Sequence, residues 1–166
     1  MATKGNARLK KLSTGAREFP GACVVIVKTE WNAGIVDELE KGCRKILSKE
    51  GVKMVSTITV PGAIEIPFAS KSYWDKVKYR DDRPQAFISL GCVIQGDTPH
   101  FDYVCQSVTA GVTHLNLHLP IPVIFGVLTV NNQKQAEERI GGKHGHKGEE
   151  AAFTALKMIS LIKSFK

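Results

Sequence analysis

Residues 91–102 contain the side chains best suited to acid–base chemistry and anion binding. Two glycines precede Asp97, Thr98 and His100 in this segment. The glycines have the spacing of a nucleotide triphosphate loop, but Asp97 stands where that motif needs lysine, which excludes the function. What remains is a glycine turn before a helix start, which can hold an anion, beside an imidazole that can exchange protons. A structural role for His100 is the alternative.

Three other segments offer an aromatic ring, a carboxylate and two fixed cations. Trp31 follows an apolar run, and its ring could stack on a flat ligand or cover the edge of the core. Glu65 could bind hydroxyl or amide groups, or only favour a helix dipole. Arg139 and Lys147 flank a glycine-rich turn and suit a phosphate group, with solvated cations as the alternative.

The sequence contains no pattern typical of a metal or disulfide site. His114 and His118 are four residues apart but lack the intervening glutamate of the HExxH zinc motif, so we interpret them as surface or packing histidines. The four cysteines lie singly in apolar runs, without zinc-finger or CxxC spacing. We therefore expect reduced thiols, a cytoplasmic protein and no bound metal.

Length and charge exclude several classes of protein. The chain has 166 residues, of which 43% are hydrophobic and 23% charged, as in one soluble domain. Its longest apolar run, residues 121–130, is too short to span a bilayer, and no secretory signal is recognisable. The net charge of +7 comes from the two termini, because the rest of the chain is nearly neutral. Neither a membrane nor a nucleic-acid partner is therefore expected.

Strand and helix patterns alternate along the chain and would position these side chains. Short β-branched runs predict strands at residues 21–29, 52–60, 85–94 and 123–130. Apolar residues at three- and four-residue intervals predict helices at residues 33–50, 63–77, 101–119, 133–139 and 149–164, with a turn at 141–148. Buried strands joined by helices favour an α/β fold, a three-layer αβα sandwich with a four-stranded parallel sheet of the flavodoxin-like type.

The predicted sheet brings the candidate residues together. Ligands of open α/β sheets bind beyond the carboxyl ends of the strands, where most of the candidate segments lie. Residues 21–166 are expected to form one domain, and residues 1–20, which lack a core pattern, a separate N-terminal segment. The residues alone therefore predict a protein that binds a small phosphorylated ligand near an aromatic ring and a histidine.

Four motifs taken together resemble the lumazine synthase family. They are VPGAIEIP from Val60, GCVIQGDTPHFDYV from Gly91, PVIFGVLTVNNQKQAEER from Pro122 and GHKGEEAAFTAL from Gly145. The resemblance covers about residues 18–165. It implies condensation of 5-amino-6-(D-ribitylamino)uracil with 3,4-dihydroxy-2-butanone 4-phosphate. The products are 6,7-dimethyl-8-ribityllumazine, phosphate and water, at the penultimate step of riboflavin biosynthesis, without metal or organic cofactor.

The resemblance also implies roles for individual residues, with His100 as the proton shuttle. Contacts to the ribityl-uracil would come from Trp31, Ala63, Ile64, Glu65, Cys92, Val93, Ile94 and Phe125. Contacts to the butanone phosphate would come from Asp97, Thr98, Arg139 and Lys147. A carboxylate is unfavourable beside phosphate unless only its N–H faces the ligand, so Thr98 is a better candidate than Asp97.

Assembly is a further implication of the resemblance. It implies a homo-oligomer, a pentamer with active sites between subunits, in which Phe125, Arg139 and Lys147 face the neighbouring chain. Residues 1–20 could add a strand to a neighbour's sheet edge. The short connection between Arg139 and Lys147 favours an icosahedral shell of sixty subunits over a free pentamer. Riboflavin synthase is a candidate partner.

Two alternative functions stay open on the sequence. One is a flavin- or nucleotide-binding electron-transfer module of the same architecture, although residues 29–32 lack the Ser/Thr-rich phosphate loop that such modules use. The other is an inactive shell-forming protein, against which the full set of substrate-contacting residue types argues.

Overall fold

The computed structural model describes residue 19 and residues 21–165 of the chain. Its sheet contains β1 (Cys23–Thr29), β2 (Met54–Val60), β3 (Ala86–Ile94) and β4 (Val123–Val130). The strands lie in the order β2-β1-β3-β4, and all three pairings are parallel. The expected α/β class and four-stranded parallel sheet are therefore confirmed, and β2 and β4 form the two edges of the sheet.

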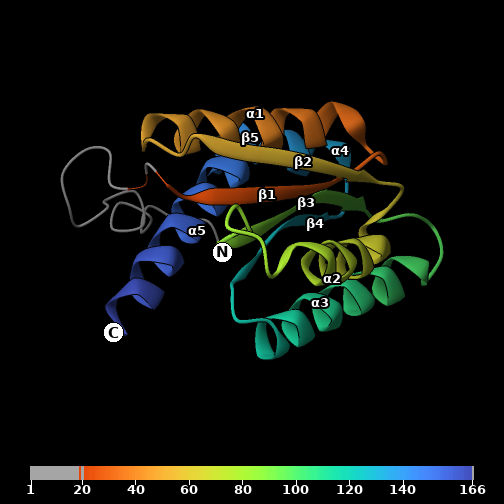
Figure 1. The fold of residues 1–166 in the computed structure, drawn as a ribbon. Coiled ribbons are helices and arrows are strands. Elements are labelled where there is room, and N and C mark those ends of the chain that lie inside the picture. The colour runs from red at the N-terminus through yellow and green to blue at the C-terminus, as the bar shows by residue number, and fades with distance from the viewer. Residues whose placement is uncertain (1–18, 20, 166) are drawn as a thin grey trace.

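Helices cover both faces of the sheet, as Figure 1 shows. They are α1 (Ala33–Lys49), α2 (Ile66–Val77), α3 (His100–His118), α4 (Gln133–Glu137) and α5 (Lys147–Ser164). Helices α1 and α5 pack on one face, and α2 and α3 on the other. Among the described residues, no helix combines the length and the apolar character needed to span a membrane.

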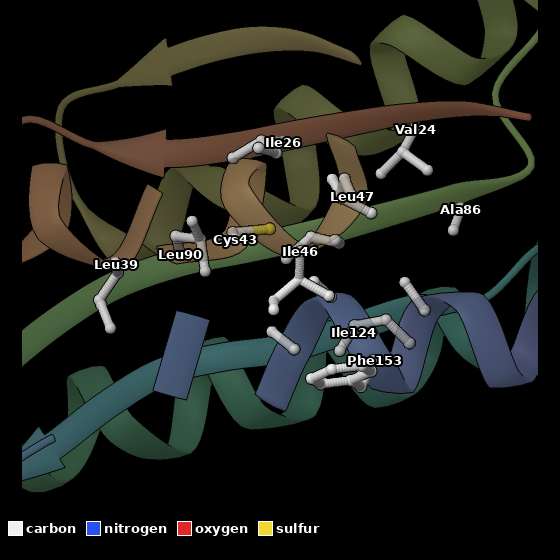
Figure 2. Close-up of a cluster of buried hydrophobic side chains, with 14 of the residues drawn as sticks. Val24, Ile26, Leu39, Cys43, Ile46, Leu47, Ala86, Leu90, Ile124 and Phe153 are labelled. Carbon is white, nitrogen blue, oxygen red and sulfur yellow. The ribbon is translucent and has the colours of Figure 1, made fainter. Parts of the chain in front are cut away.

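The core consists of two apolar layers, one on each side of the sheet. In β1, Val24 and Ile26 point toward α1 and α5, whereas Val25 and Val27 point toward α2 and α3. Figure 2 shows the first layer, in which strand residues meet side chains of α1 and Phe153 of α5. All four β1 side chains are fully buried, and each such burial stabilises the fold by about 1.5–3 kcal/mol. Because both faces of β1 are buried, its sequence is a nearly continuous apolar run.

The region before α5 differs from the expected turn. A short antiparallel hairpin forms there, from β5 (Ile140–Gly142) and β6 (Gly145–His146). Gly145 adopts a positive φ of 80°, which favours glycine. Helix α5 then starts at Lys147, two residues earlier than the periodicity predicts, because the His146 ring accepts the Glu149 N–H as a helix cap.

Two close backbone contacts attach this hairpin and α5 to α1. A Cβ on Gly148 would lie 2.0 Å from the carbonyl oxygen of Leu39, so only glycine fits. A Cβ on Gly42 would lie 2.1 Å from the His146 ring. The side chains around the hairpin are therefore held in a fixed position relative to the sheet.

The described part of the N-terminal segment also contributes to the core. Phe19 is only 3% exposed and packs in the layer under α1 and α5. The strand expected from residues 1–20 otherwise lies outside the described residues, and so does residue 166.

Candidate functional site

A cavity of about 360 Å³ lies beyond the carboxyl ends of β1, β2 and β3. Such a volume is sufficient for a small-molecule site. The residues that line the cavity come from three strand-to-helix connections and the first turns of α3; they are Thr29, Trp31, Asn32, Gly62, Ala63, Ile64, Glu65, Cys92, Val93, Ile94, His100 and Val104. Eight of the thirteen candidate residues from the sequence therefore meet here.

The connection after β1 places an indole at the cavity. Trp31 is 72% exposed, so its ring is accessible to a ligand rather than part of the core. Its backbone N–H donates to the Pro61 carbonyl at 3.2 Å, which joins the first connection to the second. Asn32 adopts a left-handed conformation with φ 58°, and its side-chain amide donates to the Cys92 carbonyl at 2.8 Å instead of capping α1. These bonds hold three connections together around one space.

The connection after β2 places a carboxylate next to that indole. Residues Ala63–Glu65 form a short 3-10 helix, η2, before α2. Glu65 accepts the Gly62 N–H at 2.8 Å, which fixes its carboxylate at the cavity. A Cβ on Gly62 would lie 3.0 Å from that carboxylate and 3.9 Å from the Trp31 ring. Glycine at this position therefore allows Trp31 and Glu65 to lie close together.

The end of β3 supplies main-chain groups. Its pairing with β1 ends at Leu90, whereas its pairing with β4 continues to Ile94. The β1-facing edge of the last residues of β3 therefore lies outside the ladder, and the Cys92 carbonyl accepts the Asn32 amide there. The Cys92 side chain is 4% exposed, and burial raises the pKa of its thiol to about 11. Cys92 is consequently neutral at physiological pH and contributes shape rather than a nucleophile.

His100 is the first residue of α3 and lines the cavity with an exposed side chain. His100 and Trp31 therefore border the same cavity. Asp97 and Thr98 lie just before it, in the exposed bend that connects β3 to α3. Neither of them lines the cavity, although both border the helix start at which an anion would bind.

A second hollow, of about 380 Å³, lies along β4 at the edge of the sheet. Phe125 and Lys147 line it, together with residues of α3 and α5. Phe125 pairs with Ser89, three residues before Cys92 in β3. Along a strand this corresponds to about 10 Å, so Phe125 does not reach the first cavity. The structure therefore separates Phe125 and Lys147 from the eight candidate residues of the first cavity within one chain.

Arg139 belongs to the same edge region as Lys147. Its guanidinium donates to Glu150 through two nitrogens, with N···O distances of 2.9 and 3.4 Å, and to the His144 carbonyl. The backbone N–H of Lys147 donates to the backbone carbonyl of Arg139 at 2.8 Å. This bond joins the two residues across the hairpin. Burial lowers the pKa of Lys147, and Arg139 acts in the same direction while Glu150 opposes it. Arg139 and Lys147, here called the basic region, are cations of the kind that bind phosphate, and the carboxylate of Glu150 pairs with Arg139.

Sequence reasoning did not identify five residues that shape these regions, namely Thr29, Asn32, Gly62, Val104 and Glu150. Thr29 and Val104 line the cavity from within apolar patterns, where nothing distinguishes them from core positions. Glu150 lies in the first turn of α5, eleven residues after its partner Arg139, and no periodic pattern connects the two. A first-turn carboxylate is usually explained by the helix dipole, which conceals its role as an arginine partner.

Comparison with known proteins identifies the family. The model of the 6,7-dimethyl-8-ribityllumazine synthase family matches residues 21–163. The chain is 47% identical over 137 residues to the 6,7-dimethyl-8-ribityllumazine synthase of Parabacteroides distasonis, covering 81% of this chain and 82% of that protein. It is 48% identical over 139 residues to the synthase of that name from Bacteroides fragilis, covering 82% and 94%.

A third relative extends the similarity to both ends. The 6,7-dimethyl-8-ribityllumazine synthase of Christiangramia forsetii is 40% identical over 171 aligned positions, covering 100% of this chain and 98% of that protein. The matches include the strand-end cavity and the basic region before α5, and the chain therefore belongs to the 6,7-dimethyl-8-ribityllumazine synthase family.

Proposed function

We propose that this chain is a transferase that condenses 5-amino-6-(D-ribitylamino)uracil with 3,4-dihydroxy-2-butanone 4-phosphate. The products are 6,7-dimethyl-8-ribityllumazine, phosphate and water, at the penultimate step of riboflavin biosynthesis. The observation that carries the proposal is the cavity in which Trp31, Glu65 and His100 meet. Relatives that carry the name of this synthase over most of the chain support the reaction.

The first substrate occupies the strand-end cavity in this proposal. The Trp31 ring stacks on the pyrimidine, since an exposed indole offers a flat apolar face. Glu65 accepts hydrogen bonds from ribityl hydroxyls alongside Ala63 and Ile64. Main-chain groups of residues 92–94 bind the uracil edge, where β3 extends beyond its pairing with β1.

The second substrate binds through its phosphate. Arg139 and Lys147 provide the cations, and Thr98 and the Asp97 N–H contribute from the start of α3. Within one chain, Arg139 and Lys147 lie by the edge strand β4 and outside the strand-end cavity. A complete site therefore needs the basic region of a neighbouring subunit beside the cavity of this one, with Phe125 closing the pyrimidine pocket.

The chemistry requires several proton transfers but no bound metal. The uracil amine attacks the ketone, and loss of water gives an imine. Phosphate then leaves by elimination, and the second nitrogen closes the ring with loss of another water. His100 can accept and donate the protons because its ring lies at the cavity. Positioning of the two substrates supplies much of the acceleration, since the amine is already nucleophilic.

The proposal extends to assembly and location. We infer a pentamer with active sites between subunits, and favour its closure into a sixty-subunit shell because only seven residues separate Arg139 from Lys147. Residues 1–20 would pair with a neighbour's sheet edge, for which the exposed strand β2 is suited. A cytoplasmic location and an association with riboflavin synthase complete the proposal.

One assay separates this function from its alternatives. The purified protein is incubated with both substrates while phosphate release and lumazine formation are followed together. Equal amounts of both products are expected, and each substrate alone should give neither. His100→Ala should slow the reaction without abolishing it. His118→Ala serves as a matched control, because His118 lies at the opposite end of α3 from His100 and does not line the cavity. No turnover by the wild-type chain would favour the inactive shell protein, and tightly bound FMN the electron-transfer module.

A further inference from the structure

His114 and His118 form a pair of stacked rings on α3. The ring centroids are 3.9 Å apart and the ring planes differ by 23°. Both residues are exposed, so the rings pack against each other and not into the core. The sequence offers only a surface or packing role for these histidines, whereas the structure shows that they form an ordered pair at the surface.

The spacing of the pair along α3 is that of a two-point ligand for a metal ion. Imidazole nitrogens bind Zn²⁺ and similar ions at about 2.0–2.1 Å, which places two neighbouring ligand nitrogens about 3.0–3.4 Å apart. In the stacked arrangement the in-plane lone pairs of the two rings do not converge, so binding one ion requires side-chain rotations that unstack the rings and turn one nitrogen of each toward the ion. Positions four apart on a helix lie on one face, and the helix fixes their spacing without further ordering.

A hydrogen bond fixes which nitrogen of the His118 ring is free to bind a metal ion. The Nδ1 atom of His118 lies 2.8 Å from the carbonyl oxygen of His114. A carbonyl only accepts, so this nitrogen carries the proton and donates. The Nε2 atom is then left with its lone pair outward in the neutral ring. Metal-binding histidines commonly have this arrangement, with the second nitrogen bonded to a carbonyl.

The pair is distinct from the proposed active site. His114 lies fourteen residues after His100 on the same helix, which corresponds to about 21 Å along the axis. Among the described residues, no group of three or more His, Cys, Asp or Glu side chains could hold a metal ion. Two imidazoles would therefore supply the protein ligands, and water would fill the remaining positions.

We propose that His114 and His118 bind one divalent transition-metal ion of the class that prefers imidazole, namely Cu²⁺, Ni²⁺ or Zn²⁺. Affinity should follow the usual order for nitrogen ligands, with Cu²⁺ bound most tightly. Binding joins two successive turns of α3, so the metal stabilises the folded state against the unfolded state. The turnover of the two organic substrates does not depend on this site.

The test is a titration of the assembled, metal-free protein with Cu²⁺, followed by calorimetry and electron paramagnetic resonance. The wild type should bind one Cu²⁺ per chain with the spectrum of a nitrogen-coordinated ion, and its thermal midpoint should rise. His114→Gln and His118→Gln should each weaken binding about tenfold or more, because either change removes the chelate. His144→Gln is the matched control and should bind as the wild type does.

A second variant separates spacing from histidine content. His114→Gln combined with Thr113→His keeps two histidines but places them five residues apart, so they no longer share a face of α3. This variant should bind Cu²⁺ as weakly as His114→Gln. Wild-type affinity in the spacing variant, or an equal loss in His144→Gln, would overturn the proposal. So would a wild type that binds no Cu²⁺.

Discussion

The strand-end cavity and the basic region before α5 contain the two halves of one proposed chemistry, but they form in different ways. The cavity gathers residues from three connections that parallel strands necessarily bring to one edge. The basic region depends on a short hairpin and on glycine contacts with α1. The cavity therefore results from the sheet topology, whereas the basic region results from a short hairpin and its local contacts. Variants that change only the cavity or only the basic region test this difference.

Arg139→Ala should give the largest effect on catalysis. It removes a two-nitrogen cation from the phosphate, and such charge-assisted bonds are worth about 1.5–3 kcal/mol each. We expect kcat/KM for the butanone phosphate to fall about 100-fold, while KM for the ribityl-uracil changes little. Steady-state kinetics with each substrate varied in turn measures this. Equal losses for both substrates would place Arg139 elsewhere, and Arg139→Lys should recover part of the activity.

Gly148→Ala should disturb the basic region without touching the cavity. The added Cβ would lie 2.0 Å from the Leu39 carbonyl, a backbone atom, so α5 must move away from α1. We expect a loss of about 2 kcal/mol or more in unfolding free energy, measured by denaturant titration. Gly34→Ala in α1 is the matched control, because its Cβ would contact nothing within 4 Å. Similar stability of the two variants would refute the close packing.

Trp31→Ala should show the opposite substrate preference. It removes the exposed ring at the cavity and leaves the basic region intact. The expected cost is on the order of 1 kcal/mol, seen as weaker binding of the ribityl-uracil. Trp31→Phe should retain most of the affinity, because a smaller ring still stacks. If the effect fell on the butanone phosphate instead, the assignment of the cavity would be wrong.

Lys147→Arg should produce the smallest change, visible only in alkaline solution. Burial lowers the pKa of Lys147, so its charge is lost at a lower pH than that of an exposed lysine. Phosphate binding should therefore weaken as the pH rises through that lowered pKa, whereas arginine stays charged. KM for the butanone phosphate, measured from neutral to alkaline pH, should rise for the wild type and stay flatter for the variant. Parallel profiles would exclude Lys147 from the phosphate site.

The sequence predicts the cavity better than the basic region, for a physical reason. β-branched runs and helical periodicity define the strands, and parallel strands end at one edge, so Trp31, Glu65 and His100 are expected to converge. The orientation of Asn32 is not foreseen, because its amide bonds to Cys92, sixty residues away in the chain. A contact of that kind depends on the packed sheet and leaves no local pattern.

The basic region is harder to predict because its elements are short and lack periodicity. Residues 140–146 contain glycines that permit a turn or a hairpin equally well, and only the structure shows β5 and β6. The role of His146 as a helix cap and the pairing of Arg139 with Glu150 follow from that hairpin. Phe125 is a further example of what the sequence does not predict. Alternation along β4 predicts the face of the sheet on which its side chain lies, but not which cavity the side chain borders.

Co-assembly of two impaired variants tests most directly whether the cavity and the basic region of different subunits form one site. One variant carries Trp31→Ala with His100→Ala, and the other carries Arg139→Ala. After joint unfolding and refolding in equal amounts, about one quarter of the interfaces should combine an intact cavity with an intact basic region. The account predicts that activity recovers to about that fraction of the wild type. Activity no higher than the average of the separate variants, in oligomers shown to be mixed, would contradict it.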